Sequence, residues 1–314
     1  MPATGPDSPP SPEAINPPSD WEHIHLWHAV RKALHTLPSR FQSEVVISGV
    51  LATDLFAFNS SLGATIEEQF VASLNRLRNL WDPEQRYALF SFERHPQTFP
   101  DVVLRASAPD VKPRVLMGIE LKGWYVLAKE REPSFRYKVT PAVCAPGDLL
   151  TVVPWALSNV ISGSPRVFSP FVIGARHAAE YRNWHWQHAK SGKGDNSIRL
   201  SRVTGHYPTK SDMIADDPAS DKGKNFGRLA RTGVMDKYIV DLFDEKLAGI
   251  PMIAWQKFLA IFTESRTADD ILRSLDRVGL TFAASTGLGL TEEARTELQH
   301  KFREIADILA GPAS

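Results

Sequence analysis

Two spacings of apolar residues alternate along the chain, and each predicts a different kind of element. Apolar side chains three and four residues apart predict helices over residues 21–37 and 62–81. In the second helix Ile66, Phe70 and Leu74 fall on one stripe. The same criterion predicts helices over residues 44–58, 176–190, 237–265, 267–278 and 291–309.

Short apolar runs rich in β-branched and aromatic residues predict strands over residues 87–92, 99–105, 114–122 and 166–175. Strands interleaved with helices favour an α/β fold, with a mixed central β-sheet flanked by helices and additional N- and C-terminal helices. We expect one domain over residues 21–314. Residues 1–20 hold seven prolines and few apolar side chains, which predicts a disordered arm.

Charged residues interrupt the two adjacent strands at 99–105 and 114–122. Because side chains alternate along a strand, Glu120 and Lys122 project to one face and Leu121 to the other. If the two strands pair as a hairpin, Asp101 approaches Glu120 across the ladder. Two neighbouring carboxylates repel each other and favour a hard divalent cation such as Mg²⁺. A lysine beside them can orient or deprotonate an attacking water and offset charge on a phosphate, as hydrolysis of a phosphodiester requires.

An acid-x-Lys triplet on a strand is commonly a solvated edge or a cross-strand ion pair. Here the apolar runs VLMGI and GWYVLA flank the triplet, which is typical of a buried central strand. Unpaired charge is costly in such a strand, so the triplet calls for a functional explanation.

Pro100 and Asp101, followed on the next strand by Glu120, Leu121 and Lys122, resemble the PD-(D/E)XK nuclease signature. The surrounding segments look like type II restriction endonucleases. The resemblance implies a restriction-endonuclease-like fold and Mg²⁺-dependent catalysis. In the mechanism that it implies, Asp101 and Glu120 hold the metal and Lys122 helps to position the attacking water.

The resemblance also implies a further carboxylate from the helix that precedes the motif. Glu67 lies at the border of the apolar stripe of residues 62–81 and can face the sheet, whereas Glu68 lies opposite the stripe. Glu67 is therefore the candidate for completing the metal shell or orienting Lys122. Glu68 is the alternative candidate. If neither residue has a function, the two are a pair of acids on the helix surface.

The polar stretch from residue 190 to residue 237 lacks clear periodicity and holds ten Lys or Arg against six Asp. Basic side chains spaced among Asn, Ser and Thr suit phosphate contacts and the reading of base edges. Residues 221–231 are similar to restriction-enzyme segments that lie near DNA, and a solvated insertion is the alternative. The candidate DNA contacts are Lys193, Arg199, Arg202, Lys210, Lys224, Asn225, Arg228 and Arg231.

Charge and composition narrow the function further. The chain holds 36 basic and 36 acidic residues, so any DNA binding must depend on a local patch. The single cysteine, Cys144, excludes an intramolecular disulfide, fits a reducing cytoplasm and is expected to be a small buried side chain. No apolar run reaches the roughly 18 residues that a membrane span needs. His23, His25 and His28 are expected on a solvated helix face rather than in a metal site.

These features predict a Mg²⁺-dependent, type II-like restriction endonuclease that hydrolyses phosphodiester bonds of double-stranded DNA at a specific sequence. The resemblance further implies a homodimer, because a symmetric DNA site suits a two-fold protein. It also implies a cognate DNA methyltransferase in the same host and a place in the bacterial or archaeal cytoplasm, associated with the nucleoid. Two alternatives stay open: a structure-selective DNA repair or junction-resolving nuclease, and a non-catalytic DNA-binding module.

Overall fold

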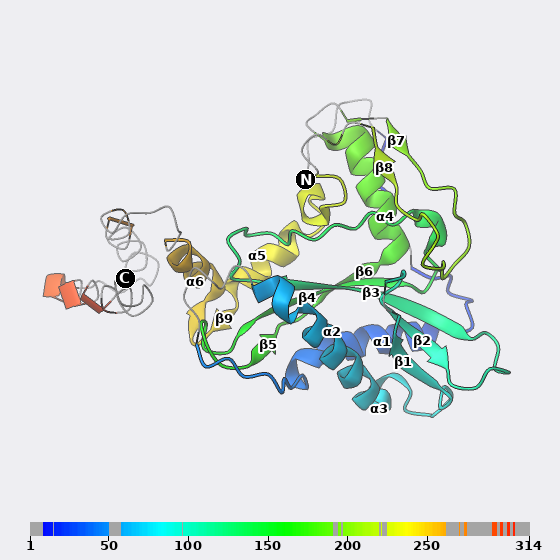
Figure 1. Cartoon of the computed structure of the whole chain (residues 1–314), viewed down its shortest axis with the longest axis horizontal. Helices are drawn as coiled ribbons and strands as arrows, with labels where there is room; N and C mark the ends of the chain where they lie inside the picture. The colour runs from blue at the N-terminus through cyan, green and yellow to red at the C-terminus, as the bar shows by residue number, and fades with distance from the viewer. Residues whose placement is uncertain are drawn as a thin grey trace.

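A mixed six-stranded sheet forms the centre of the protein (Figure 1). The computed structural model describes residues 9–14, 16–49, 58–95, 97–190, 194–195, 197–219, 221 and 225–261, together with scattered positions between 270 and 304. The strands are β1 (Phe90–Arg94), β2 (Val102–Ala106), β3 (Val115–Tyr125), β4 (Leu149–Leu157), β5 (Pro165–Val167) and β6 (Phe171–Gly174). Their order is β1-β2-β3-β4-β5, with β6 also paired to β4. The β3–β4 pair is parallel and the other pairs are antiparallel.

Helices cover both faces of this sheet. On one side lie α1 (Ile24–Thr36), α2 (Phe58–Arg76) and α3 (Arg78–Trp81), and on the other lies α4 (Ala175–Trp184) (Figure 1). The adjacent β4 residues Leu149 and Leu150 belong to two different apolar clusters, the first shared with α1 and α2 and the second with α4. Successive residues of a strand point to opposite faces, so both faces of β4 are buried. The expected α/β class with a mixed central sheet is confirmed.

The elements after α4 are shorter. The π-helical turn η4 (His185–Ala189) extends α4, and the strands β7 (Ile198–Arg199) and β8 (Asp217–Pro218) form a small hairpin. The 3-10 turn η6 (Leu229–Thr232) leads to α5 (Asp236–Asp244), the hairpin of β9 (Lys246–Leu247) with β10 (Ile250–Pro251), and α6 (Met252–Leu259). Two further 3-10 turns are η1 (Leu37–Ser39) and η3 (Pro141–Val143).

Several expected elements differ from the structure. The helix expected over 62–81 is divided at Leu77 into α2 and α3. Residues 44–49 are not helical, because the backbone of Ile47 exchanges two hydrogen bonds with that of Gly163, 3.0 and 2.8 Å long; residues 50–57 of that expected helix lie outside the described residues. The helix expected over 237–265 is two helices, because Ala248 and Gly249 both take positive φ angles and form a turn. The strand expected over 166–175 is divided into β5 and β6, with Pro170 in the gap, where it cannot donate to a ladder.

Residues at both ends of the chain are described only in part. Residues 9–14 and 16–20 contain neither helix nor strand, and the Trp184 indole donates a 2.9 Å hydrogen bond to the Pro9 carbonyl, which holds this part of the arm against α4. The described positions within 267–278 and 292–304 are helical, as expected, and the rest of those two expected helices lies outside the described residues. Within the described part of the chain, no helix is long and apolar enough to cross a membrane.

A buried ion pair fastens the irregular segment after α4 to the rest of the protein. The Arg182 guanidinium lies 2.7 Å from Asp216 and donates to the carbonyls of Tyr137 and Val139 at 2.8 and 3.0 Å. The two charged side chains are 1% and 0% exposed. Because Asp216 and Phe226 are both buried, the interpretation of this segment as a solvated insertion is wrong at these positions.

Replacing Asp216 should therefore destabilise the protein much more than replacing its neighbour Asp217. Asp216→Ala leaves the Arg182 charge buried without a partner, and we expect a loss of about 3–5 kcal/mol in the free energy of unfolding. The Asp217 side chain is 53% exposed and pairs with Arg199 at 3.3 Å, so Asp217→Ala should cost at most about 1 kcal/mol. Urea titrations of the two variants measure the difference. Equal losses would show that the buried pair does not hold the segment.

Candidate active site

The β2–β3 hairpin brings together the two acids of the sequence motif. Val102 pairs with Ile119 in the antiparallel register, and continuing that register places Asp101 opposite Glu120. The Leu121 amide donates a 2.9 Å hydrogen bond to Asp101 Oδ2, which fixes this carboxylate against β3. The predicted hairpin and the predicted central position of β3 are both confirmed.

Lys122 joins the two acids into one cluster. Its Nζ lies 2.7 Å from Glu120 Oε1 and 3.4 Å from Asp101 Oδ2. Glu120 is the buried member, with a side chain only 9% exposed, whereas the side chains of Asp101 and Lys122 are 30% and 22% exposed. The cluster therefore lies within the sheet at Glu120 and reaches solvent at Asp101.

The charges of this cluster act strongly on one another. Burial raises the pKa of Glu120 to about 7, and the Asp101 carboxylate adds to this effect while Lys122 opposes it. Burial alone would lower the pKa of Lys122, but the Glu120 and Asp101 carboxylates outweigh burial and leave that pKa raised. Lys122 is therefore an ammonium at neutral pH, and Glu120 is a carboxyl that binds a proton easily.

One oxygen of Glu120 needs a partner that the described residues do not supply. Its Oε2 is buried, and no hydrogen bond reaches it from the described part of the chain. A buried carboxylate oxygen without a partner is costly, and a divalent cation would satisfy it and oppose its protonation. Asp101 and Glu120 thus fit a hard cation such as Mg²⁺, which is commonly held by one or two carboxylates with waters and substrate phosphates completing its shell. The described residues form no group of three or more His, Cys, Asp or Glu that could hold a metal ion by itself.

Glu67 reaches this cluster from α2, which packs against β1 and β3. Burial raises the pKa of Glu67 and Asp101 raises it further, whereas Lys122 and Arg94 lower it. Its Oε2 lies 3.7 Å from Arg94. Glu68 is exposed, so of the two acids considered for this position Glu67 is the one that faces the sheet.

Two residues at the end of β1 also adjoin the cluster, although their sequence carries no recognised motif. The His95 amide donates a 2.6 Å hydrogen bond to the Asp101 carbonyl, and Arg94 pairs with Val102 in the β1–β2 ladder. His95 Nδ1 is buried and has no hydrogen-bond partner among the described residues. Pairing the expected strands 87–92 and 99–105 as a hairpin would have indicated both residues.

The candidate DNA contacts fall in separate places. Arg199, Arg202, Lys210 and Arg231 are exposed, and Lys193 and Lys224 lie outside the described residues. Lys210 donates to Gln97, in the loop that leads to Asp101. Arg231 donates to Asn225, and Arg228 lies 3.3 Å from Glu130, so these three candidates lie around the C-terminal end of α4.

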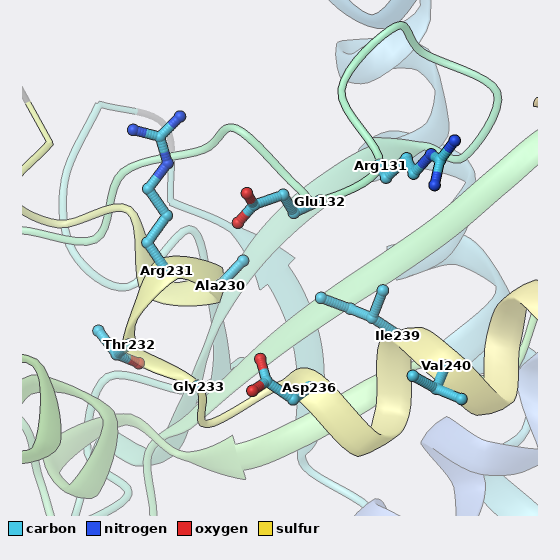
Figure 2. A pocket seen from close by; sticks show the side chains of 9 residues that line it. All are labelled: Arg131, Glu132, Ala230, Arg231, Thr232, Gly233, Asp236, Ile239 and Val240. Atoms are coloured by element: carbon cyan, nitrogen blue, oxygen red, sulfur yellow. The ribbon is translucent and has the colours of Figure 1, made fainter. Parts of the chain in front are cut away.

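A cavity of about 740 Å³ lies beside these last residues, and none of the motif residues lines it (Figure 2). Arg131 and Glu132 come from the loop after β3, Arg231 from η6, and Asp236 and Ile239 from α5. Its acids and bases balance, so its charge favours neither an anion nor a cation. The carboxylate–lysine cluster lies apart from this cavity and is accessible to solvent at Asp101 and Lys122.

Cys144, His25 and His28 lie as the sequence predicts, whereas His23 is half-buried and precedes α1 rather than lying on its solvated face. Cys144 is fully buried, its Sγ lies 3.5 Å from the Tyr137 hydroxyl, and burial raises the pKa of the thiol to about 12. His25 and His28 are exposed on α1, while His23 contacts the Tyr87 hydroxyl at 3.1 Å.

The fold and this geometry define a class of protein: an α/β domain with a carboxylate–lysine cluster on the central strand of a mixed sheet. Comparison of the chain with models of known protein families, with curated proteins and with solved structures finds no match. The functional argument therefore depends on the site itself.

The raised pKa of Glu120 predicts how the stability of the metal-free protein depends on pH. The folded value of about 7 exceeds the ordinary 4.5, so folding favours the protonated form. The stabilisation from this proton is complete below about pH 4 and is lost as the pH rises through about 7. In EDTA the urea midpoint of the native protein should fall between about pH 4.5 and pH 7, and more steeply than that of Glu120→Gln.

The comparison with Glu120→Gln is needed because burial also raises the pKa of Asp148 to about 7, and Asp148 is present in both proteins. Parallel pH profiles for the two proteins would contradict the assignment to Glu120.

Proposed function

We propose that this protein is a Mg²⁺-dependent, type II-like restriction endonuclease that hydrolyses phosphodiester bonds of double-stranded DNA at a specific sequence. The observation that carries the proposal is the buried Oε2 of Glu120, which has no hydrogen-bond partner among the described residues. It lies beside Asp101, and the other oxygen of the same carboxylate, Oε1, is 2.7 Å from Lys122 Nζ. A buried carboxylate oxygen without a hydrogen-bond partner contributes nothing to the stability of the fold. A metal site, by contrast, needs such an oxygen as a ligand.

The residues of the cluster have distinct roles in this proposal. Asp101 and Glu120 hold Mg²⁺, which when bound supplies a Lewis acid that stabilises charge on the phosphate under attack. Lys122, being charged, donates hydrogen bonds and cannot accept a proton, so it orients the attacking water and offsets negative charge rather than acting as a base. Glu67 lies where it can orient Lys122 or complete the metal shell.

The choice of DNA as substrate depends on two features. The cluster is open to solvent at Asp101 and Lys122, and Lys210 lies beside the loop that leads to Asp101, where its charge suits a neighbouring phosphate. The proposal extends to a homodimer on a symmetric site, a cognate DNA methyltransferase in the same host, and a place in the cytoplasm close to the nucleoid.

Incubation of a methylation-free phage genome with the protein and Mg²⁺, followed by sequencing of the fragment ends, tests the activity. We expect discrete fragments from the native protein. Lys122→Ala should lower the cleavage rate by at least about 100-fold, the scale on which loss of a charge-stabilising donor acts. Lys257→Ala, which removes an exposed lysine of α6, is the matched control and should cleave like the native protein.

Other outcomes distinguish the alternative functions. Preference for branched over linear duplex DNA would favour a repair or junction-resolving nuclease. Tight binding in EDTA without cleavage of any DNA in Mg²⁺ would favour a DNA-binding module. Equal cleavage by the native protein and Lys122→Ala would refute the proposed catalytic cluster.

The neighbours Glu67 and Glu68 provide a second matched comparison. Glu67→Gln removes an acid whose charge acts on Asp101 and Lys122, and we expect a 10–100-fold loss of cleavage rate, as is usual for residues that position a metal site. Glu68→Gln changes an exposed side chain and should stay within about two-fold of the native rate. Rates measured on one plasmid under single-turnover conditions compare them directly. Equal effects of the two substitutions would exclude Glu67 from the site.

A further inference from the structure

A second group of polar side chains lies at the C-terminal end of α4. There the turn η4 meets residues 225–232, and the two segments enclose a cavity of about 360 Å³. This volume lies within the range of about 300–1,000 Å³ that is typical of small-molecule sites. The cavity is formed without Asp101, Glu120, Lys122 or Glu67.

The charge around this cavity is positive. Four cationic side chains line it, namely Arg182, Lys190, Arg228 and Arg231. Arg182 is paired with Asp216, and Arg228 NH1 lies 3.3 Å from Glu130, whose side chain is 50% exposed. Lys190 lies 3.5 Å from the centre of the Trp186 ring and Arg231 donates to Asn225, but neither forms an ion pair within the described part of the chain. Arg231 also lines the larger cavity together with Glu132 and Asp236, but no acidic residue of the described part of the chain lines the smaller cavity, so its lining carries an excess of positive charge that favours an anion.

The cationic side chains that line the cavity carry hydrogen-bond donors and no acceptors. Asn225 and Thr232 add polar side chains to the same lining. The ligand that fits should therefore be an anion with several acceptor oxygens.

We propose that this cavity binds a phosphate group. A phosphate offers three or more acceptor oxygens with negative charge, which matches the guanidinium groups of Arg228 and Arg231 and the ammonium of Lys190. Burial lowers the pKa of His185, and Lys190 lowers it further, so the positive charge of the lining comes from the arginines and Lys190 rather than from this ring. The phosphate can come from a nucleic-acid backbone or from a free phosphate compound, because both present the same chemistry. The site does not depend on the proposed cleavage activity.

A thermal-shift measurement in EDTA tests whether phosphate binds. Inorganic phosphate is compared with chloride and with acetate at equal ionic strength, for the native protein, Arg231→Gln, Arg228→Gln and the control Arg86→Gln. Arg86 is an exposed arginine outside the cavity. We expect phosphate to raise the melting temperature of the native protein and the control above the value in the other two salts, and this rise should be lost in both cavity variants. Arg231 is exposed, so its variant should keep the unliganded melting temperature even if Arg228→Gln does not.

Anisotropy titrations with a short duplex in EDTA, at several salt concentrations, identify the source of the phosphate. If a backbone phosphate fills the cavity, the slope of the logarithm of the DNA association constant against the logarithm of the salt concentration should decrease in magnitude by about one unit in Arg231→Gln. The slope should not change in Arg86→Gln. A lost thermal shift with an unchanged slope would support the site with a free phosphate compound as its ligand. The proposal is overturned if phosphate stabilises the native protein no more than chloride does and the slopes agree. Because these tests use no Mg²⁺, failure of cleavage would not affect them.

Discussion

The burial of Glu120 beside Lys122 on the central strand is the constraint on which the rest of the structure depends. A carboxyl in this position loses most of its hydration, and its raised pKa measures that loss. The ion pair with Lys122 compensates for one oxygen of the carboxylate and leaves Oε2 without a partner among the described residues. β4 pairs with β3 along Ile119–Tyr125, whereas β2 pairs with it only as far as Ile119. Beyond that point the Asp101 side chain takes the place of a strand partner and accepts from the Leu121 amide.

The register that presents the cluster is itself fixed by buried side chains. Gly118 has no Cβ, and a Cβ there would overlap the Pro100 ring that precedes Asp101. The Gly118 amide donates to Asp148 at 2.7 Å, and the same carboxylate accepts from the Ala145 amide at 2.8 Å and from the Tyr207 hydroxyl at 3.3 Å. Asp148 therefore connects β3, the turn before β4 and the irregular segment. The Tyr207–Asp148 hydrogen bond and the Arg182–Asp216 ion pair both attach that segment to the rest of the protein. Its exposed basic side chains therefore project from a backbone that is held in place.

The strands and the acidic cluster were predictable from the sequence because they depend on local order: a two-residue period and one short turn place Asp101, Glu120 and Lys122 together. Features that depend on distant partners were not predictable. The segment around Ile47 looks helical by its apolar content, but it pairs with Gly163 instead. Arg182 and Asp216 have the appearance of surface charges in the sequence, yet each is buried only because the other is. The phosphate cavity likewise combines residues of α4 with a segment about 40 positions later, and no spacing rule links the two.

The two sites have opposite chemistry, and this explains how a chain with equal numbers of acids and bases could act on a polyanion. At the sheet, two carboxylates would repel a phosphate unless a cation stood between them, so the proposed activity requires a bound metal. At the cavity, a lining with four cationic side chains and no acid among the described residues would favour a phosphate without a metal. A packed path joins the two places: Arg182 donates to the Tyr137 carbonyl, and the Tyr137 ring lies 6.4 Å from that of Phe99, two residues before Asp101. Packed side chains thus connect the cavity with the cluster, and the two proposals together predict a substrate that meets cations at one place and a bound metal at the other.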